Sequence, residues 1–201
     1  MALAATLACA APAAAKPLKL VALGDSLTAG CGLPAGQAFP DVLARALKAK
    51  GWDVEVVNAG VSGDTAADGL ARYDWSVSDG ADAIIVELGA NDMLRGADPA
   101  ATEVTLSDIL AKTHDAHLAT LLAGMLAAPN YGEDYKRRFD AIYPELAQKF
   151  SVTLYPFFLE GVAGARTLQL DDGLHPNRAG VERIVQGILP SVEAVLAQAK
   201  R

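Results

Sequence analysis

The stretch LKLVALGDSL, residues 18–27, joins an apolar run to a short polar turn. Its first part, Leu18–Leu23, is largely continuous rather than alternating between apolar and polar residues. Such a run is typical of a strand that is covered on both faces, as in a parallel sheet. The turn Gly24–Leu27 therefore follows the carboxyl end of a buried strand, and it places Ser26 at that end.

Four further apolar runs predict strands in the same way: Val54–Asn58, Ala83–Leu88, Leu118–Met125 and Val152–Tyr155. Apolar residues recur at helical spacing in the segments Phe39–Lys50, Ala100–Lys112, Tyr135–Phe150 and Arg178–Leu189. We expect Pro144 to interrupt the third of these helices and Pro190 to end the fourth. Strands that alternate with helices predict an α/β fold, with helices on both faces of a five-stranded parallel sheet. We expect the strand order 2-1-3-4-5, with right-handed crossovers.

Composition limits the classes of function. The chain has 201 residues, of which 52% are hydrophobic, so one domain with a proper core is expected. The net charge of −7 disfavours nucleic acid as a partner, because nucleic-acid-binding proteins present a basic face.

Residues 1–15 differ from the rest of the chain. They carry no charge, are mostly alanine and end in small residues, which is typical of a secretory signal peptide. The segment is too short to span a bilayer, so stable membrane insertion is not expected. We therefore predict a signal peptide over residues 1–15, a single domain over residues 16–201, and export, to the periplasm. Cleavage after Ala15 would leave Cys31 as the one cysteine, which we expect to be a packed small residue.

Polar segments follow the predicted strand ends. They are Gly24–Leu27, Gly60–Thr65, Gly89–Asp92 and Asp172–His175. In an open parallel sheet, ligands bind beyond the carboxyl ends of the strands, where the strand order reverses. We expect the first three segments to converge there, and the fourth to join them.

The residue types in these segments point to nucleophilic catalysis. A serine hydroxyl needs a base to remove its proton, and the base is usually a histidine that a carboxylate orients. Ser26, His175 and Asp172 provide these three groups, with Asp172 and His175 three residues apart in one predicted turn. The backbone N–H groups of Ser26 and Gly63 and the side-chain amide of Asn91 would provide an oxyanion hole.

The same segments resemble the four sequence blocks of the SGNH, or GDSL, hydrolases. The likeness covers about residues 18–190 and is greatest to the bacterial thioesterase I, lysophospholipase L1 and arylesterase branch, with Ala90 standing where glycine is frequent. It implies a three-layer α/β/α, flavodoxin-like fold. It also implies Ser26 as the nucleophile, Asp172 and His175 as the rest of the triad, and Gly63 and Asn91 as oxyanion donors. The implied substrates are small-molecule acyl esters, aryl esters, acyl thioesters and lysophospholipids, and no cofactor or metal is implied.

Several side chains near these blocks could line an acyl pocket. The candidates are Met93, Leu94, Arg95, Tyr131, Phe157, Phe158 and Leu174, all of which could equally be ordinary core. His114 and His117 are three residues apart, but no cysteine or carboxylate cluster completes a tetrahedral metal site.

Two alternatives to a general esterase stay open. A carbohydrate O-deacetylase would use the same triad on a sugar acetate. A flavodoxin-like binding module would hold a phosphate at the first loop, which would explain Ser26 and Thr28 but not Asp172 and His175. The sequence also leaves open the acyl-chain length, the choice between ester and thioester, and the oligomeric state.

Overall fold

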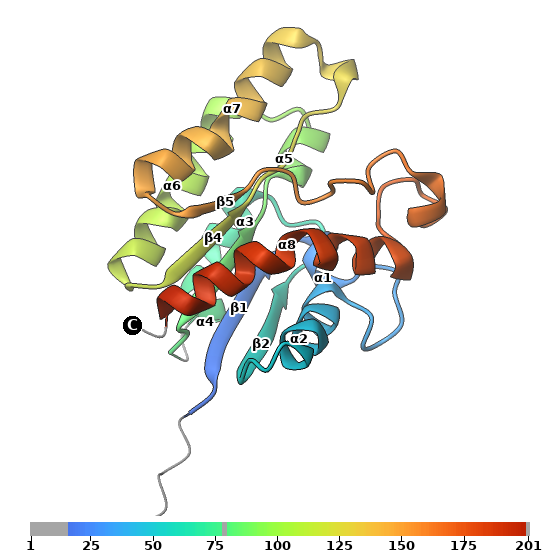
Figure 1. Cartoon of the computed structure of the whole chain (residues 1–201). Helices are drawn as coiled ribbons and strands as arrows, with labels where there is room; N and C mark the ends of the chain where they lie inside the picture. The colour runs from blue at the N-terminus through green and yellow to red at the C-terminus, as the bar shows by residue number, and fades with distance from the viewer. Residues whose placement is uncertain (1–15, 78–79, 200–201) are drawn as a thin grey trace, which may run out of the picture.

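A five-stranded parallel sheet forms the centre of the computed structural model, which describes residues 16–77 and 80–199 (Figure 1). The strands are β1 (Leu18–Gly24), β2 (Val54–Gly60), β3 (Ala83–Glu87), β4 (Ala119–Ala123) and β5 (Thr153–Tyr155). Their spatial order is β2-β1-β3-β4-β5, and all neighbouring pairs are parallel. The predicted strand order is confirmed. The predicted signal peptide over residues 1–15 lies outside the described residues.

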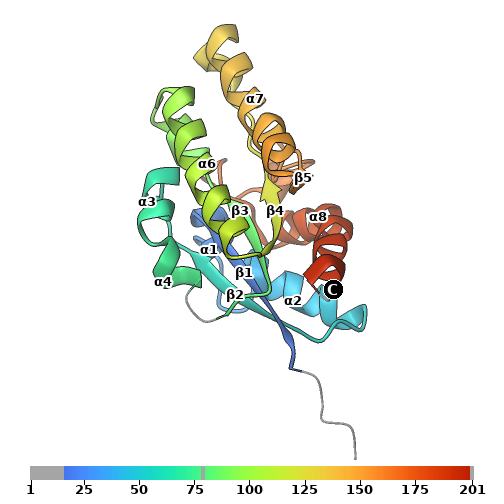
Figure 2. The same ribbon diagram turned by 90° about the vertical axis from the view of Figure 1, so that its left-hand side faces the viewer.

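Helices cover both faces of the sheet, which gives three layers (Figure 2). One face carries α1 (Ser26–Ala29), α2 (Phe39–Ala49) and α8 (Arg178–Ala199). The other carries α3 (Ala66–Ala71), α4 (Tyr73–Val77), α6 (Pro99–Asp115) and α7 (Glu133–Phe150). A short helix, α5 (Ala90–Leu94), follows β3, and two 3₁₀ turns lie at Pro129–Tyr131 and Arg166–Leu168.

Both prolines that were expected to break helices lie inside them. Helix α8 continues through Pro190 to Ala199, and α7 continues through Pro144 to Phe150. A proline inside a helix costs about 3 kcal/mol. Beyond Pro190, the side chains of Val192, Val195 and Leu196 are fully buried, so packing of this last part of α8 offsets that cost. The prediction that Pro190 ends the helix was therefore wrong. Within residues 16–77 and 80–199, no helix is both long enough and apolar enough to cross a bilayer.

The strand register brings the carboxyl ends of three strands to one edge. Gly24 of β1 pairs with Gly60 of β2 on one side and with Glu87 of β3 on the other. At Gly60 the backbone of α1 lies directly against the strand, since an added Cβ atom would come 2.3 Å from the Ala29 nitrogen. The loops that follow these strands consequently begin side by side.

Tyr143 of α7 ties the core to the loop after β3. Its fully buried hydroxyl donates a hydrogen bond of 2.9 Å to the carbonyl of Leu88. The Tyr135 hydroxyl is also buried, but no described residue bonds it. We predict that Tyr143→Phe lowers the free energy of unfolding by about 1–3 kcal/mol, because it leaves a buried carbonyl unpaired.

Tyr135→Phe is the matched control, and it should leave the stability within about 0.5 kcal/mol of the parent. Urea unfolding of both variants measures the difference. Equal losses in the two variants would contradict a specific role for the Tyr143 hydrogen bond.

Candidate active site

Ser26 is the first residue of α1 and follows β1 after a single residue, Asp25. Asp25 is fully buried, and its Oδ1 accepts a hydrogen bond from the Leu27 N–H at 2.9 Å. This side-chain cap turns the chain sharply from strand to helix. The Ser26 side chain is thereby left half-buried at the edge of the sheet.

His175 joins Ser26 to Asp172 through two hydrogen bonds. Its Nε2 lies 2.9 Å from the Ser26 Oγ, and its Nδ1 lies 2.6 Å from the Asp172 Oδ2. The other carboxylate oxygen, Oδ1, accepts the backbone N–H groups of Leu174 and His175 at 2.9 and 3.0 Å. The tight turn expected between Asp172 and His175 is therefore present.

The charge on Asp172 sets the tautomer of His175. Backbone hydrogen bonding from Leu174, together with the hydrogen bond from the His175 side chain, lowers the pKa of Asp172 to about 2. The carboxylate is ionised above that pH and can only accept, so the hydrogen lies on Nδ1 of His175. Nε2 is then free to accept the proton of the Ser26 hydroxyl.

The two other predicted oxyanion residues lie beside Ser26. Gly63 has a φ of +90°, which side chains rarely adopt, although nothing lies within 4 Å of where a Cβ would be. Conformation, rather than lack of space, is therefore the reason for glycine at this position. The Gly63 carbonyl accepts a 2.7 Å hydrogen bond from the Arg95 guanidinium, which holds the loop from its other side.

Asn91 is oriented by two acceptors. Its Nδ2 donates to the Asp25 Oδ2 at 3.1 Å and to the Asp64 carbonyl at 2.9 Å. Both amide hydrogens are thus directed at protein oxygens. An oxyanion beside Ser26 would share one of them.

Sequence reasoning missed Arg72, the C-cap residue of α3. Its guanidinium bonds the Asp64 carboxylate at 2.6 Å and the carbonyls of Ala59 and Gly24 at 2.8 Å each. One side chain therefore joins the ends of β1 and β2 to the loop that carries Gly63. The capping pair of Thr65 and Asp68 predicts where α3 begins, but no local pattern indicates these contacts of Arg72.

A second missed feature is a pair of buried carboxyl groups below Ser26. Glu87 ends β3 and is fully buried, with its Oε2 accepting the Thr28 hydroxyl at 2.7 Å. Burial raises the pKa of Glu87 well above its usual range, and the Asp25 carboxylate raises it further. Burial also raises the pKa of Asp25 to about 6, against the lowering effect of the Leu27 N–H. Glu87 is therefore the member of the pair that holds its proton more strongly.

Ser26 opens on a large apolar cleft of about 760 Å³. Of the predicted residues, the cleft is lined by Ser26, Gly63, Asn91, Met93, Leu94, Phe157, Leu174 and His175. Further apolar lining comes from the segment Met125–Pro129 and from Leu159 and Ala163.

Three of the residues predicted to line the pocket do not line the cleft. Phe158 is fully buried in the core, edge-on to Phe39 with a centroid distance of 5.0 Å. Tyr131 donates its hydroxyl to the Leu94 carbonyl at 2.9 Å and does not line the cleft, and Arg95 holds Gly63 instead. Cys31, expected to be packed, is exposed and lines the cleft.

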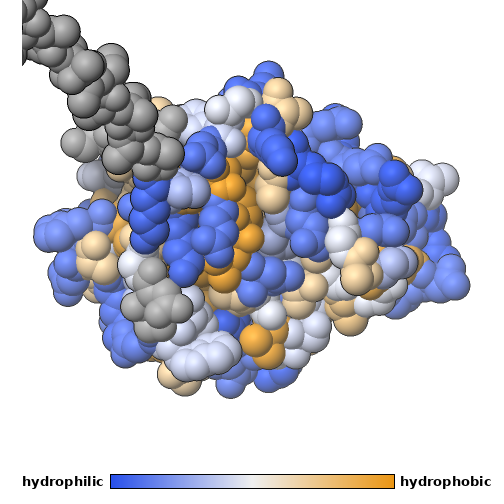
Figure 3. Space-filling model, turned by 90° about the horizontal axis from the view of Figure 1, so that it is seen from below, coloured by the Kyte–Doolittle hydropathy of each residue, from blue (hydrophilic) through white to orange (hydrophobic). Residues whose placement is uncertain are grey.

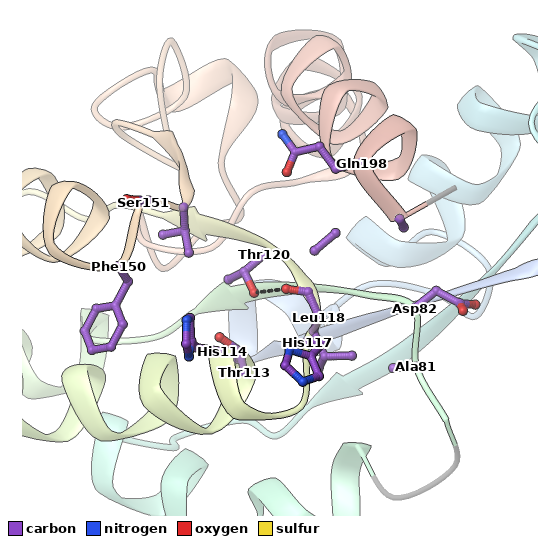
Figure 4. A pocket seen from close by; sticks show the side chains of 13 residues that line it. Ala81, Asp82, Thr113, His114, His117, Leu118, Thr120, Phe150, Ser151 and Gln198 are labelled. Atoms are coloured by element: carbon purple, nitrogen blue, oxygen red, sulfur yellow. Dashed lines mark hydrogen bonds between the residues drawn. The ribbon is translucent and has the colours of Figure 1, made fainter. Parts of the chain in front are cut away.

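Another cavity, of about 530 Å³, lies at the opposite edge of the sheet, by the amino ends of β3 to β5 (Figure 4). His114 and His117 are on its wall, together with Asp82. Among residues 16–77 and 80–199, no group of three or more histidine, cysteine or acidic side chains could hold a metal ion. Figure 3 views the molecule from this side, where a narrow hydrophobic strip lies between hydrophilic side chains. The Ser26 cleft, which opens on the hydrogen-bonded chain from Ser26 through His175 to Asp172, is therefore the candidate active site.

Comparisons with known proteins agree with this geometry. The chain is 38% identical over 178 residues to the esterase TesA of Pseudomonas aeruginosa, and the match covers 88% of this chain and 89% of that protein. It is 44% identical over 160 residues to an Escherichia coli protein named thioesterase 1/protease 1/lysophospholipase L1, covering 79% and 76% of the two chains. The crystal structure of AlinE4, an SGNH-hydrolase family esterase, matches with a TM-score of 0.77 at 42% identity, over 92% of this chain and 99% of AlinE4.

A comparison with models of protein families assigns the chain to a family, because the match covers most of its length. The family model of GDSL-like lipases and acylhydrolases matches residues 22–183, which include all four sequence blocks. The expected three-layer fold and the strand order are also those observed. This chain belongs to the GDSL-like lipase/acylhydrolase family.

Proposed function

We propose that this protein is a serine esterase that hydrolyses carboxylic esters with apolar acyl or aryl groups, and acyl thioesters and lysophospholipids of similar shape. One observation carries the proposal: the hydrogen-bonded chain from Ser26 through His175 to Asp172 opens on an apolar cleft. The names of the relatives, which include an esterase, an arylesterase and a thioesterase/lysophospholipase, support it.

The proposed reaction has two halves. The Ser26 Oγ attacks the carbonyl carbon while its proton passes to Nε2 of His175, and Asp172 stabilises the imidazolium that forms. The oxyanion is stabilised by the N–H groups of Ser26 and Gly63 and by the Asn91 amide. Collapse of the intermediate breaks the bond to the alcohol or thiol, which takes the proton from His175. Water, activated by His175, then hydrolyses the acyl-enzyme in the same way.

The cleft argues against the sugar and phosphate alternatives. A sugar ring needs polar partners for its hydroxyls, whereas most residues that line the cleft are apolar, among them Met93, Leu94, Phe157 and Leu159. A phosphate at the Ser26 turn would lie near two carboxylates, those of Asp25 and Asp172, and like charges repel.

We also propose that the enzyme is exported, to the periplasm. The uncharged, alanine-rich composition of residues 1–15 supports this proposal. Export would bring the enzyme to acyl substrates outside the cytoplasm.

Replacing members of the triad tests the mechanism. We predict that Ser26→Ala lowers kcat at least about a thousandfold, and that Asp172→Asn lowers it about ten-thousandfold, as the same change does in a serine protease triad. Both variants should unfold at urea concentrations close to the parent.

The neighbouring Asp171 provides the matched control for Asp172. It is exposed and lies outside the hydrogen-bonded chain to Ser26, so Asp171→Asn should keep kcat within about twofold of the parent. Hydrolysis of p-nitrophenyl butyrate measures all three variants. Ser26→Ala with parental turnover would refute the mechanism.

The apolar cleft predicts a preference in acyl length. Each methylene buried in it contributes about 0.8 kcal/mol, so kcat/KM for p-nitrophenyl esters should rise at least about tenfold from acetate to octanoate. An acetylated xylooligosaccharide should be a poor substrate. A rate that is highest for acetate, and higher still for the acetylated sugar, would instead identify a carbohydrate O-deacetylase.

A further inference from the structure

We propose that Asp25 is a positioning residue of the reaction, whose carboxylate fixes the Asn91 amide in register with the Ser26 nucleophile. The inference rests on the proposed esterase function. It assigns a role to a buried acidic group that the triad chemistry does not use.

The geometry gives Asp25 a bond to each side of the site. Its Oδ1 accepts the N–H of Leu27, the residue after Ser26, and its Oδ2 accepts the amide of Asn91. The two partners are therefore the turn that presents the nucleophile and the side chain proposed as an oxyanion donor. Any rotation of the Asp25 side chain would move one relative to the other.

The Asn91 side-chain amide also donates to the Asp64 carbonyl, at 2.9 Å. That carbonyl belongs to the loop of Gly63, which Arg72 and Arg95 hold from outside. With Asp25 the amide has two acceptors, which define the plane of its NH₂ group. With only one acceptor the amide could rotate, and its direction toward an oxyanion would no longer be set.

The charge of Asp25 is part of this arrangement. The titratable and charged groups that face it are Glu87 of β3, Asp64 of the loop after β2, Tyr143 of α7 and His175 of the last loop. Of the two carboxyl groups Glu87 holds its proton more strongly, so the negative charge of the buried pair lies on Asp25. An ionised carboxylate accepts more strongly than a protonated one, and hydrogen bonds to charged groups are the stronger kind. Below about pH 6 protonation of Asp25 weakens its hold on Asn91.

Asp25→Asn is the direct test. The new side chain keeps an oxygen for the Leu27 N–H but turns an NH₂ group toward the NH₂ of Asn91, so their hydrogen bond is lost. We expect kcat for p-nitrophenyl butyrate to fall about ten- to a hundredfold, which is less than the effect of deleting an oxyanion donor, with KM changed less than about twofold. The concentration of reactive Ser26 is titrated with an alkyl fluorophosphonate, and kcat is calculated per reactive Ser26. A loss of folded protein then does not lower the measured kcat.

Asp25→Ser is the second variant, since its hydroxyl can cap Leu27 but is too short to reach Asn91. It should lose as much kcat as Asp25→Asn. Glu87→Gln is the matched control: it changes the other member of the buried pair, which bonds Thr28 rather than Asn91, and it imitates the protonated acid. Its kcat should stay within about twofold of the parent.

A double-mutant cycle separates positioning from general stability. Asn91→Ala should lower kcat about a hundred- to a thousandfold, and adding Asp25→Asn should lower it no further. The ratio of parent to Asp25→Asn turnover should fall as the pH drops below about 6, because the parent then loses the same charge.

The outcomes distinguish this inference from the proposed function. Parental kcat in Asp25→Asn, an effect that multiplies with that of Asn91→Ala, or a ratio that does not change with pH would overturn the positioning role while Ser26→Ala stays inactive. Full activity in Ser26→Ala would instead overturn the esterase mechanism on which the inference rests.

Discussion

The parallel register of β1, β2 and β3 is the constraint on which the rest of the structure depends. Because Gly24, Gly60 and Glu87 lie side by side, the loops that follow them start at one edge of the sheet. Ser26, Gly63 and Asn91 are each within four residues of that edge. No long-range rearrangement is needed to bring Ser26 and the proposed oxyanion donors together, because hydrogen bonding between the strands has already done so. The guanidinium of Arg72 then ties two strand ends to the Gly63 loop.

His175, the proposed base, lies on a different part of the chain, and the ionised Asp172 carboxylate sets its tautomer. The chain after β5 has little regular structure before α8, so His175 depends on its own turn, which the Asp172 carboxylate organises through the N–H groups of Leu174 and His175. Asp172 is ionised and exposed, whereas Asp25 is ionised only above about pH 6 because it is buried. The two aspartates near Ser26 thus lie in different environments and have different proposed roles. Asp172 orients His175, whereas Asp25 positions the Asn91 amide.

The sequence predicted most of this architecture, and the exceptions have physical reasons. The continuous apolar runs predicted the strands and their order. The polar segments that follow the strand ends predicted that Ser26, Gly63, Asn91 and His175 would lie close together. The prediction that Pro190 ends the last helix was wrong, because helix propensity does not include the tertiary packing of Val192 and Val195. Phe158 was expected in the pocket and lies in the core, whereas Cys31 was expected to be packed and lines the cleft. Apolar character alone does not say whether a side chain faces the core or a cleft. Arg72 and Glu87 act through contacts distant in sequence, at 48 and 59 residues, which no local pattern encodes.

The central claim is that Ser26 forms a covalent adduct with the acyl group. Intact-protein and peptide mass spectrometry after reaction with an alkyl fluorophosphonate tests it most directly. The account predicts a single phosphonyl group on the peptide that contains Ser26, formed in proportion to the loss of esterase activity, and no label on Ser26→Ala. Label on Ser62 or Cys31, which also line the cleft, or inactivation without label on Ser26, would contradict it.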